Sequence, residues 1–204
     1  HSEGYKFLAI SIITTFVVLL FSKILGLFLI IITIWVYYFF RDPERFPVND
    51  DSFLVSPADG LVIDISERTG PMELQLENTS YTKISIFMNV FNCHVNRTPL
   101  AGTVEEISYK PGKFLNASLD KASDENERNY YKIKCLKSGE EIIMVQIAGL
   151  IARRIVCEVE QGQSLKQGDR VGMIRFGSRV DIFFKNKKVL AKIGQNVVAG
   201  ESLI

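Results

Sequence analysis

The stretches GQSLKQG at residues 162–168 and GQNVVAG at residues 194–200 decide the fold, because they read as two copies of one turn. In both copies the glycines are six positions apart and an apolar residue lies between them. A second repeat lies upstream, where PADGLV at 57–62 matches PLAGTV at 99–104 and an isoleucine follows each copy three residues later. Glycine at fixed places between short apolar segments is typical of turns that join strands. The sequence therefore predicts a β-rich domain with internal repeats.

Short β-branched or aromatic runs alternate with glycine, proline and asparagine through this part of the chain. We expect strands at 61–65, 83–90, 103–108, 130–136, 141–147, 155–159, 171–174, 180–184 and 189–193. The glycine-spaced units resemble the hairpin turns of biotinyl and lipoyl domains and of barrel-sandwich hybrid folds. A carrier lysine between two methionines is missing, so this resemblance supports the architecture and not a carrier function. The predicted fold class is mostly β, with a barrel-sandwich-hybrid-like domain.

The N-terminal segment has a different composition, because the 34 residues from 7 to 40 carry a single charge, Lys23. As one helix this run would be about 51 Å long, well beyond the ~30 Å hydrocarbon core of a bilayer. Lys23 and Gly26 divide it into apolar stretches at 7–22 and 27–40. We therefore expect a membrane-associated helical hairpin at 1–46 and a β-rich catalytic domain at 47–204.

The residues that flank the apolar run predict its orientation. Trp35, Tyr37 and Tyr38 precede Arg41 and Arg45, which is typical of an aromatic belt followed by positive charge on the cytoplasmic side of the cell membrane. A secretory signal peptide is one alternative, but the run is too long and lacks a small-residue cleavage site. A buried core hairpin is another, but the run exceeds what the remaining domain usually buries.

Composition excludes several function classes. The net charge of +1 gives no electrostatic reason to expect nucleic acid as a partner. The three cysteines have no CxxC spacing, so neither a disulfide framework nor a cysteine zinc site is expected, and we expect no metal. His94 is the only internal histidine, and thus the one internal side chain that titrates near neutrality at its ordinary pKa.

The pair Gly177-Ser178 lies in the strand-like run RFGSRVDIFF at 175–184. A glycine bulge followed by an ordinary strand serine is the plain interpretation. A serine after a flexible glycine could instead attack its own backbone, which requires a base and a carboxylate that orients the base. His94 is the candidate base. Asp59, in the PADG turn, is the candidate carboxylate, although Asp-Gly pairs are also common as simple turns.

Four motifs occur in a fixed order: FRDP at 40–43, SPADG at 56–60, CHVNRTP at 93–99 and FGSR at 176–179. This ordered set, from the apolar run to the C-terminus, resembles the short, prokaryotic-type form of the phosphatidylserine decarboxylase proenzymes.

The resemblance implies a self-cleaving enzyme, with a large chain of 1–177 and a small chain of 178–204. His94, oriented by Asp59, would deprotonate Ser178, whose oxygen would attack the Gly177 carbonyl. Elimination and hydrolysis would leave a covalent pyruvoyl group at residue 178, which forms a Schiff base with the substrate amine and serves as an electron sink. Phosphatidylserine would yield phosphatidylethanolamine and CO₂, with His94 also a candidate proton donor.

This chain departs from the longer members of that family at two places. They usually carry Leu-Gly-Ser-Thr at the cleavage site, whereas this chain has the FGSR form that we associate with the short branch. They also have a second histidine, three residues before the one that matches His94, and this chain has Phe91 at that position. The acid used in decarboxylation therefore stays unassigned, and so do the lipid tails, because short-branch relatives include enzymes for ether lipids.

A phosphodiester substrate also needs cationic or amide donors. Arg97, Arg153, Arg154 and Arg179 are candidates because guanidinium groups bind phosphate in a bidentate manner, although solvated or ion-paired arginines would look the same in sequence. The expected partners are a phospholipid substrate, the membrane and the two chains of the proenzyme; a homo-oligomer stays open.

Two rival functions stay open. A membrane-tethered barrel-sandwich carrier or adaptor would explain the apolar hairpin and the glycine repeats, but not the combination of Ser178, His94 and Asp59. A serine hydrolase would need a Gly-x-Ser-x-Gly elbow, which residues 176–180 do not provide.

Overall fold

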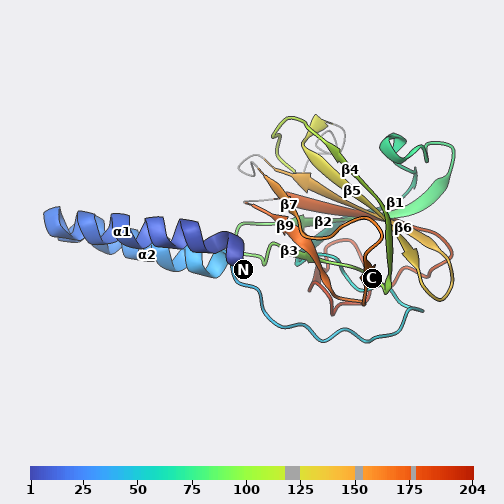
Figure 1. The fold of residues 1–204 in the computed structure, drawn as a ribbon, viewed down its shortest axis with the longest axis horizontal. Coiled ribbons are helices and arrows are strands. Elements are labelled where there is room, and N and C mark those ends of the chain that lie inside the picture. Colours follow the sequence, from blue (N-terminus) through green and yellow to red (C-terminus); the bar gives the residue numbers. More distant parts are fainter. Residues whose placement is uncertain (118–124, 150–153, 176–177) are drawn as a thin grey trace. The chain divides into compact units, whose positions relative to one another are not determined.

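The computed structural model describes residues 1–117, 125–149, 154–175 and 178–204. The chain divides into two compact units, His1–Glu44 and Arg45–Ile204. This boundary lies two residues before the one expected from the sequence. The first unit is helical and the second is built from strands (Figure 1). A mostly β fold preceded by apolar helices is thereby confirmed.

The first unit is a helical hairpin formed by a short 3-10 turn, Ser2–Gly4, and two helices, α1 (Tyr5–Phe21) and α2 (Lys23–Phe39). The turn between the helices is a single residue, Ser22, whose backbone is extended and whose hydroxyl caps the Leu25 N–H at 3.4 Å. Lys23 and Gly26, which divide the apolar run in the sequence, both lie inside α2. Gly26 lies opposite Leu19, where a Cβ would clash, so this glycine allows the two helices to approach.

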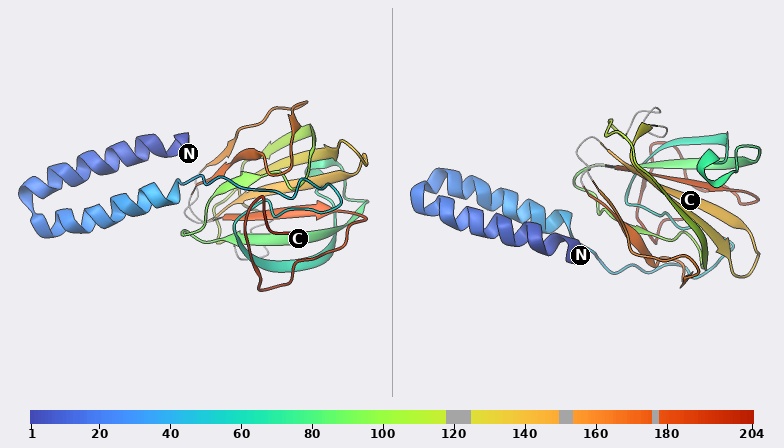
Figure 2. Two further views of the ribbon diagram at one scale, coloured as in Figure 1. Left: turned by 90° about the horizontal axis from the view of Figure 1, so that it is seen from below. Right: turned by 45° about the horizontal axis from the view of Figure 1, so that its top comes forward.

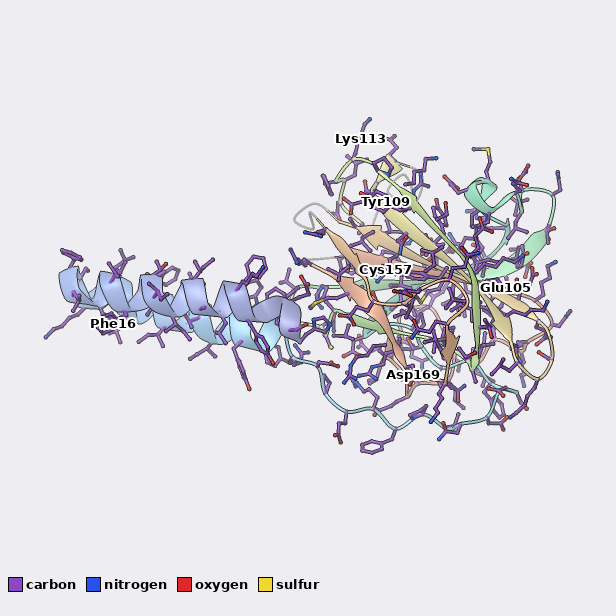
Figure 3. The ribbon with its side chains drawn as sticks, viewed as in Figure 1. Phe16, Glu105, Tyr109, Lys113, Cys157 and Asp169 are labelled. Atoms are coloured by element: carbon purple, nitrogen blue, oxygen red, sulfur yellow. The ribbon has the colours of Figure 1, made fainter. Side chains whose placement is uncertain are left out.

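Polar side chains of the hairpin contact one another, whereas most of its large apolar side chains are exposed. Ser11 and Thr15 hydrogen-bond the Thr33 hydroxyl at 2.6 and 2.9 Å across the helix pair. Phe16 is 64% exposed and Ile24 is 86% exposed, and such side chains project from both helices (Figure 3). Of the described helices, the one over Ser2–Phe21 is long and apolar enough to cross a membrane, and Lys23–Phe39 is shorter. With polar side chains between the helices and apolar ones outside, the hairpin suits an apolar surrounding medium.

The second unit contains two antiparallel sheets and one 3-10 turn, Met72–Leu74. The larger sheet has the strand order β11-β1-β2-β10-β6-β5-β4-β8 and curls over the smaller one, β3-β9-β7 (Figures 1 and 2). The strands are β1 (Gly60–Thr69), β2 (Ser80–Met88), β3 (Val95–Arg97), β4 (Gly102–Lys110), β5 (Arg128–Cys135), β6 (Glu141–Ala148), β7 (Ile155–Cys157), β8 (Ser164–Leu165), β9 (Arg170–Ile174), β10 (Ser178–Phe184) and β11 (Asn196–Val197).

The main hydrophobic core lies between the two sheets. Alternate residues of β10, namely Val180, Ile182 and Phe184, point into it from the larger sheet, and Val171 and Ile174 contribute from β9. The opposite face of the larger sheet carries a smaller apolar cluster that includes Val145, Ile147 and Phe183. We call these the inner and the outer face of the larger sheet.

The repeats seen in the sequence form two equivalent turn units. In the first, Gly60 pairs with Val197 at the start of β1; in the second, Gly102 pairs with Leu165 at the start of β4. The Gly194 N–H donates to the Val62 carbonyl at 2.8 Å, and the Gly162 N–H donates to the Val104 carbonyl at 2.7 Å. The units also pair with each other, because the Arg97 N–H donates to Pro57 O and the Val55 N–H donates to Pro99 O. The bond from Arg97 to Pro57 joins the CHVNRTP segment directly to the PADG turn.

Candidate active site

Ser178 is the first residue of β10 and lies on the inner face of the larger sheet. Its backbone is paired on both sides, with Met88 of β2 and Ala148 of β6. The side chain has no exposed surface, and among the described residues its Oγ has no hydrogen-bond partner. A buried hydroxyl without a partner costs about 1–3 kcal/mol, and native structures rarely keep one without a functional reason.

His94 approaches the same region from the smaller sheet. It immediately precedes β3 and is fully buried. Its carbonyl accepts a hydrogen bond from the Ile174 N–H at 3.3 Å, so His94 lies beside the last residue of β9. The imidazole Nδ1 is 3.0 Å from the Asn92 carbonyl, an acceptor, so Nδ1 carries the proton in the neutral ring. This tautomer makes Nε2 the basic nitrogen.

Asp59 lies in the turn that leads into β1. Both carboxylate oxygens accept hydrogen bonds from Arg45 Nη2, at 3.0 and 2.9 Å, and Oδ1 also accepts the Ala199 N–H at 2.8 Å. His94 is not among these partners. The turn itself is close to the histidine segment through the Pro57 carbonyl, so the orientation of His94 by Asp59 stays a prediction.

A buried polar network that the sequence analysis missed links the strands around Ser178. Asn96 Oδ1 accepts from Gln146 Nε2 at 2.8 Å, and Gln146 Oε1 accepts from the Tyr131 hydroxyl at 2.6 Å. Asn96 Nδ2 lies 3.6 Å from the sulfur of Met88, the residue that pairs with Ser178. Burial raises the pKa of Tyr131 well above its ordinary value, so this hydroxyl stays a proton donor. The signal in the sequence was Gln146, a polar residue at an inward-facing position of the otherwise apolar strand β6.

The four candidate arginines lie in different environments. Arg97 is buried and its Nη1 donates to the Gly168 carbonyl at 2.9 Å. Arg154 is exposed, and its carbonyl accepts the Arg175 N–H. Arg179 is fully buried on the outer face. Arg153 and Gly177, at the predicted cleavage site, lie outside the described residues, so the predictions for these two, like the substrate role of the others, stay predictions.

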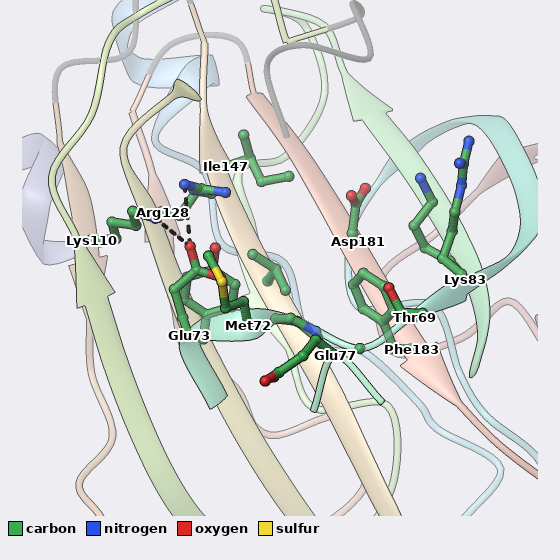
Figure 4. Close-up of a pocket in the computed structure, with 15 residues that line it drawn as sticks. Thr69, Met72, Glu73, Glu77, Lys83, Lys110, Arg128, Ile147, Asp181 and Phe183 are labelled. Atoms are coloured by element: carbon green, nitrogen blue, oxygen red, sulfur yellow. Dashed lines mark hydrogen bonds and ion pairs between the residues drawn. The ribbon is translucent and has the colours of Figure 1, made fainter. Parts of the chain in front are cut away.

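A pocket of about 650 Å³ lies on the outer face, below the connection between β1 and β2 (Figure 4). Tyr130, Phe183 and Glu73 are among the residues that line it, and Glu73 bonds Lys110 at 2.6 Å and lies 3.4 Å from Arg128. Burial raises the pKa of Glu73, but these cationic partners outweigh it and leave the pKa lowered. Neither Ser178 nor His94 lines this pocket, so it is separate from the site on the inner face.

The fold and the site together define a β-domain protein with an apolar helical hairpin and, on the inner face of its larger sheet, a buried serine whose hydroxyl has no hydrogen-bond partner among the described residues. Comparison with known proteins gives the family. The phosphatidylserine decarboxylase family model matches residues 32–204, and the chain belongs to this family.

Three relatives illustrate the similarity, and each is named phosphatidylserine decarboxylase proenzyme. The protein of Pelagibacter ubique is 64% identical over 204 residues, which cover 100% of this chain and 94% of that protein. The Ruegeria pomeroyi protein is 48% identical, with 100% of this chain and 93% of that protein covered. The Rickettsia akari protein is also 48% identical, with 100% and 88% covered.

Proposed function

We propose that this protein decarboxylates phosphatidylserine to phosphatidylethanolamine, and that it first cleaves itself between Gly177 and Ser178. Membership of the phosphatidylserine decarboxylase family supports the substrate and the reaction. The observation that carries the self-cleavage is the Ser178 hydroxyl, which is buried on the inner face of the larger sheet and has no hydrogen-bond partner among the described residues. A hydroxyl in this position is available to react rather than committed to the structure.

In the proposed processing reaction, His94 Nε2 takes the proton of Ser178 Oγ, which attacks the carbonyl carbon of residue 177. The backbone C–N bond breaks and an ester forms, with the amine of residue 178 released. Loss of the α-proton of residue 178 then expels the ester carboxylate, which becomes the new C-terminus at 177. The remaining enamine takes up one water, loses ammonia and leaves a pyruvoyl group at residue 178.

The pyruvoyl ketone would supply the electron sink for the carbanion that loss of CO₂ leaves behind. The residues described here fit such a group, because residue 178 is held in the middle of the larger sheet by two neighbouring strands. Burial excludes bulk water from the reacting carbon. His94 is the candidate that returns a proton to this carbon, and Asp59 the candidate that orients His94.

The helical hairpin would hold the enzyme in the same membrane as its lipid substrate. We place the protein at the cell inner membrane with the β domain on the cytoplasmic side, on the basis of the aromatic residues and arginines that end the apolar run. Trp35 is the only tryptophan, so its fluorescence reports on the hairpin alone. Brominated lipids should quench it; emission that brominated lipids leave unchanged would contradict membrane insertion.

The activity is tested by incubating the full-length protein with phosphatidylserine in mixed micelles and measuring CO₂ release. The wild-type protein should release CO₂ in step with phosphatidylethanolamine formation. Ser178→Ala and His94→Ala should release none above background. Release by Ser178→Ala at the wild-type rate would contradict the proposal.

A further inference from the structure

Arg179, the residue that follows the proposed cleavage site, has its side chain on the outer face of the larger sheet, opposite Ser178. In register it lies between Ile147 of β6 and Phe87 of β2. Its Nε donates to Asp181 Oδ1 at 2.6 Å, and its Nη2 donates to Asp181 Oδ2 at 3.0 Å and to Ser85 Oγ at 2.8 Å. We call Arg179, Asp181 and Ser85 the clamp.

The clamp is an unusual choice for stability alone. All three residues are at most 2% exposed, and Arg179 Nη1 is buried without a partner among the described residues. Desolvation of a buried ion pair offsets much of its attraction, so well-packed apolar residues of similar volume often replace such pairs at no loss of stability. The neighbours in register, Ile147 and Phe87, offer an apolar environment for such a replacement.

The proposed chemistry creates a need at this position. Cleavage removes the covalent link before residue 178, and conversion of serine to pyruvoyl removes the N–H of that residue. Residue 178 can then no longer donate a backbone hydrogen bond to the sheet. New chain ends fray unless they are tied down. Arg179 is the first residue of the small chain that keeps its full backbone pairing, and its side chain links β10 to β2.

We propose that the clamp is a positioning device, which keeps residue 178 in place in the mature enzyme after the backbone has been cut. This inference rests on the proposed function. Before cleavage the continuous backbone holds β10, so the clamp matters little. After cleavage the clamp prevents fraying of the first residues of β10 and keeps the reacting group near His94.

The test replaces the clamp by apolar residues in the full-length protein, as Arg179→Met, Asp181→Leu and Ser85→Ala together. The same replacement is also made in Ser178→Ala, which stays uncleaved. Hydrogen exchange of a peptide covering residues 178–184 is measured by mass spectrometry in both forms. We expect unchanged exchange in the uncleaved protein, at least tenfold faster exchange in the mature protein, and at least a tenfold lower kcat for decarboxylation.

A matched control is the neighbouring ion pair on the outer face, Lys83 with Asp64, whose Nζ and Oδ2 are 3.0 Å apart. Lys83→Met with Asp64→Leu also removes a charged pair from this face, but replaces no residue of β10 and none of the clamp. Exchange in 178–184 and kcat should then stay within twofold of the wild type.

Three outcomes would overturn the clamp. Wild-type exchange and kcat in the mature clamp variant would show that it positions nothing. Equally fast exchange in the uncleaved form, or failure of a folded clamp variant to cleave, would show a role before cleavage.

If the triple replacement does not fold, Arg179→Lys gives the same comparison with an effect of about threefold, since lysine cannot bind both carboxylate oxygens in the same way. An uncleaved wild-type chain would instead overturn the proposed function itself.

Discussion

The two turn units of the β domain have the same pattern of backbone hydrogen bonds, but only the first carries a carboxylate at its turn, that of Asp59. Ser56 and Thr98 occupy equivalent places, and each hydroxyl donates to the carbonyl two residues later at 2.7 Å. The position of Asp59 in the first unit is occupied by Ala101 in the second. Because the second turn forms with no carboxylate at the equivalent position, the turn itself does not require Asp59. The comparison therefore indicates that the Asp59 carboxylate has a purpose other than forming the turn.

Two purposes for Asp59 can be distinguished. Its bonds to Arg45 and to the Ala199 N–H would make it a tie between the start of the β domain and the C-terminal segment. The proposed function would make it the group that orients His94. The predictions below separate these roles, beginning with the largest effect.

The replacement Asp59→Asn should slow self-cleavage by at least a hundredfold, because general acid–base catalysis with its orienting group is worth about 10²–10⁴ in rate. Asparagine keeps an oxygen for the Arg45 hydrogen bond, so the fold should be retained. The cleavage time course is followed on denaturing gels. The matched variant in the other unit, Ala101→Asn, should cleave at the wild-type rate. Normal cleavage of Asp59→Asn, together with a lowered thermal midpoint, would assign the structural role instead.

The glycines of the two units should respond alike to substitution. Gly162 and Gly194 have φ values of +86° and +85°, and an added Cβ would meet nothing within 4 Å at either. Alanine at each should cost about 1 kcal/mol through backbone strain alone. Urea denaturation of the two single variants measures this. Costs that differ by more than about 1 kcal/mol would show that the units are not equivalent.

A smaller effect concerns Asp64, which follows the first turn unit on β1. Burial raises its pKa, but hydrogen bonds from Lys83 and Ser66 outweigh this and leave the pKa below the ordinary value of 3.8. A lowered carboxyl pKa contributes stability that is complete above about pH 4 and is lost as the pH falls through the folded-state pKa. The urea midpoint of the wild type should therefore fall more steeply below pH 4 than that of Asp64→Asn. Parallel curves would contradict this assignment.

The sequence revealed those parts of the fold that depend on local patterns. Glycine spacing identified both turn units, and the apolar run identified the helical hairpin. The sequence divided the apolar run at Lys23 and Gly26, but both residues lie inside α2, and Gly26 is in close contact with Leu19. That contact depends on a neighbouring helix, which a local pattern does not contain.

The site was only partly accessible from the sequence. Ser178 and His94 were predicted from their motifs, and their roles stay predictions; the structure adds that the His94 carbonyl contacts Ile174 at the end of β9. The bonds that join Asn96 to Gln146, and Arg179 to Ser85, connect residues 50 and 94 positions apart in the chain. Their partners depend on the order of strands in the sheet, which no spacing in the sequence specifies.

The central claim is that Ser178 becomes the N-terminal residue of a separate chain and carries a pyruvoyl group. Denaturing mass spectrometry of the fully matured, full-length protein tests this most directly. The account predicts two chains, 1–177 and 178–204, with the smaller one lighter than an unmodified peptide by the mass difference between serine and pyruvoyl. A single intact chain of 204 residues, or a small chain that still begins with serine, would contradict it.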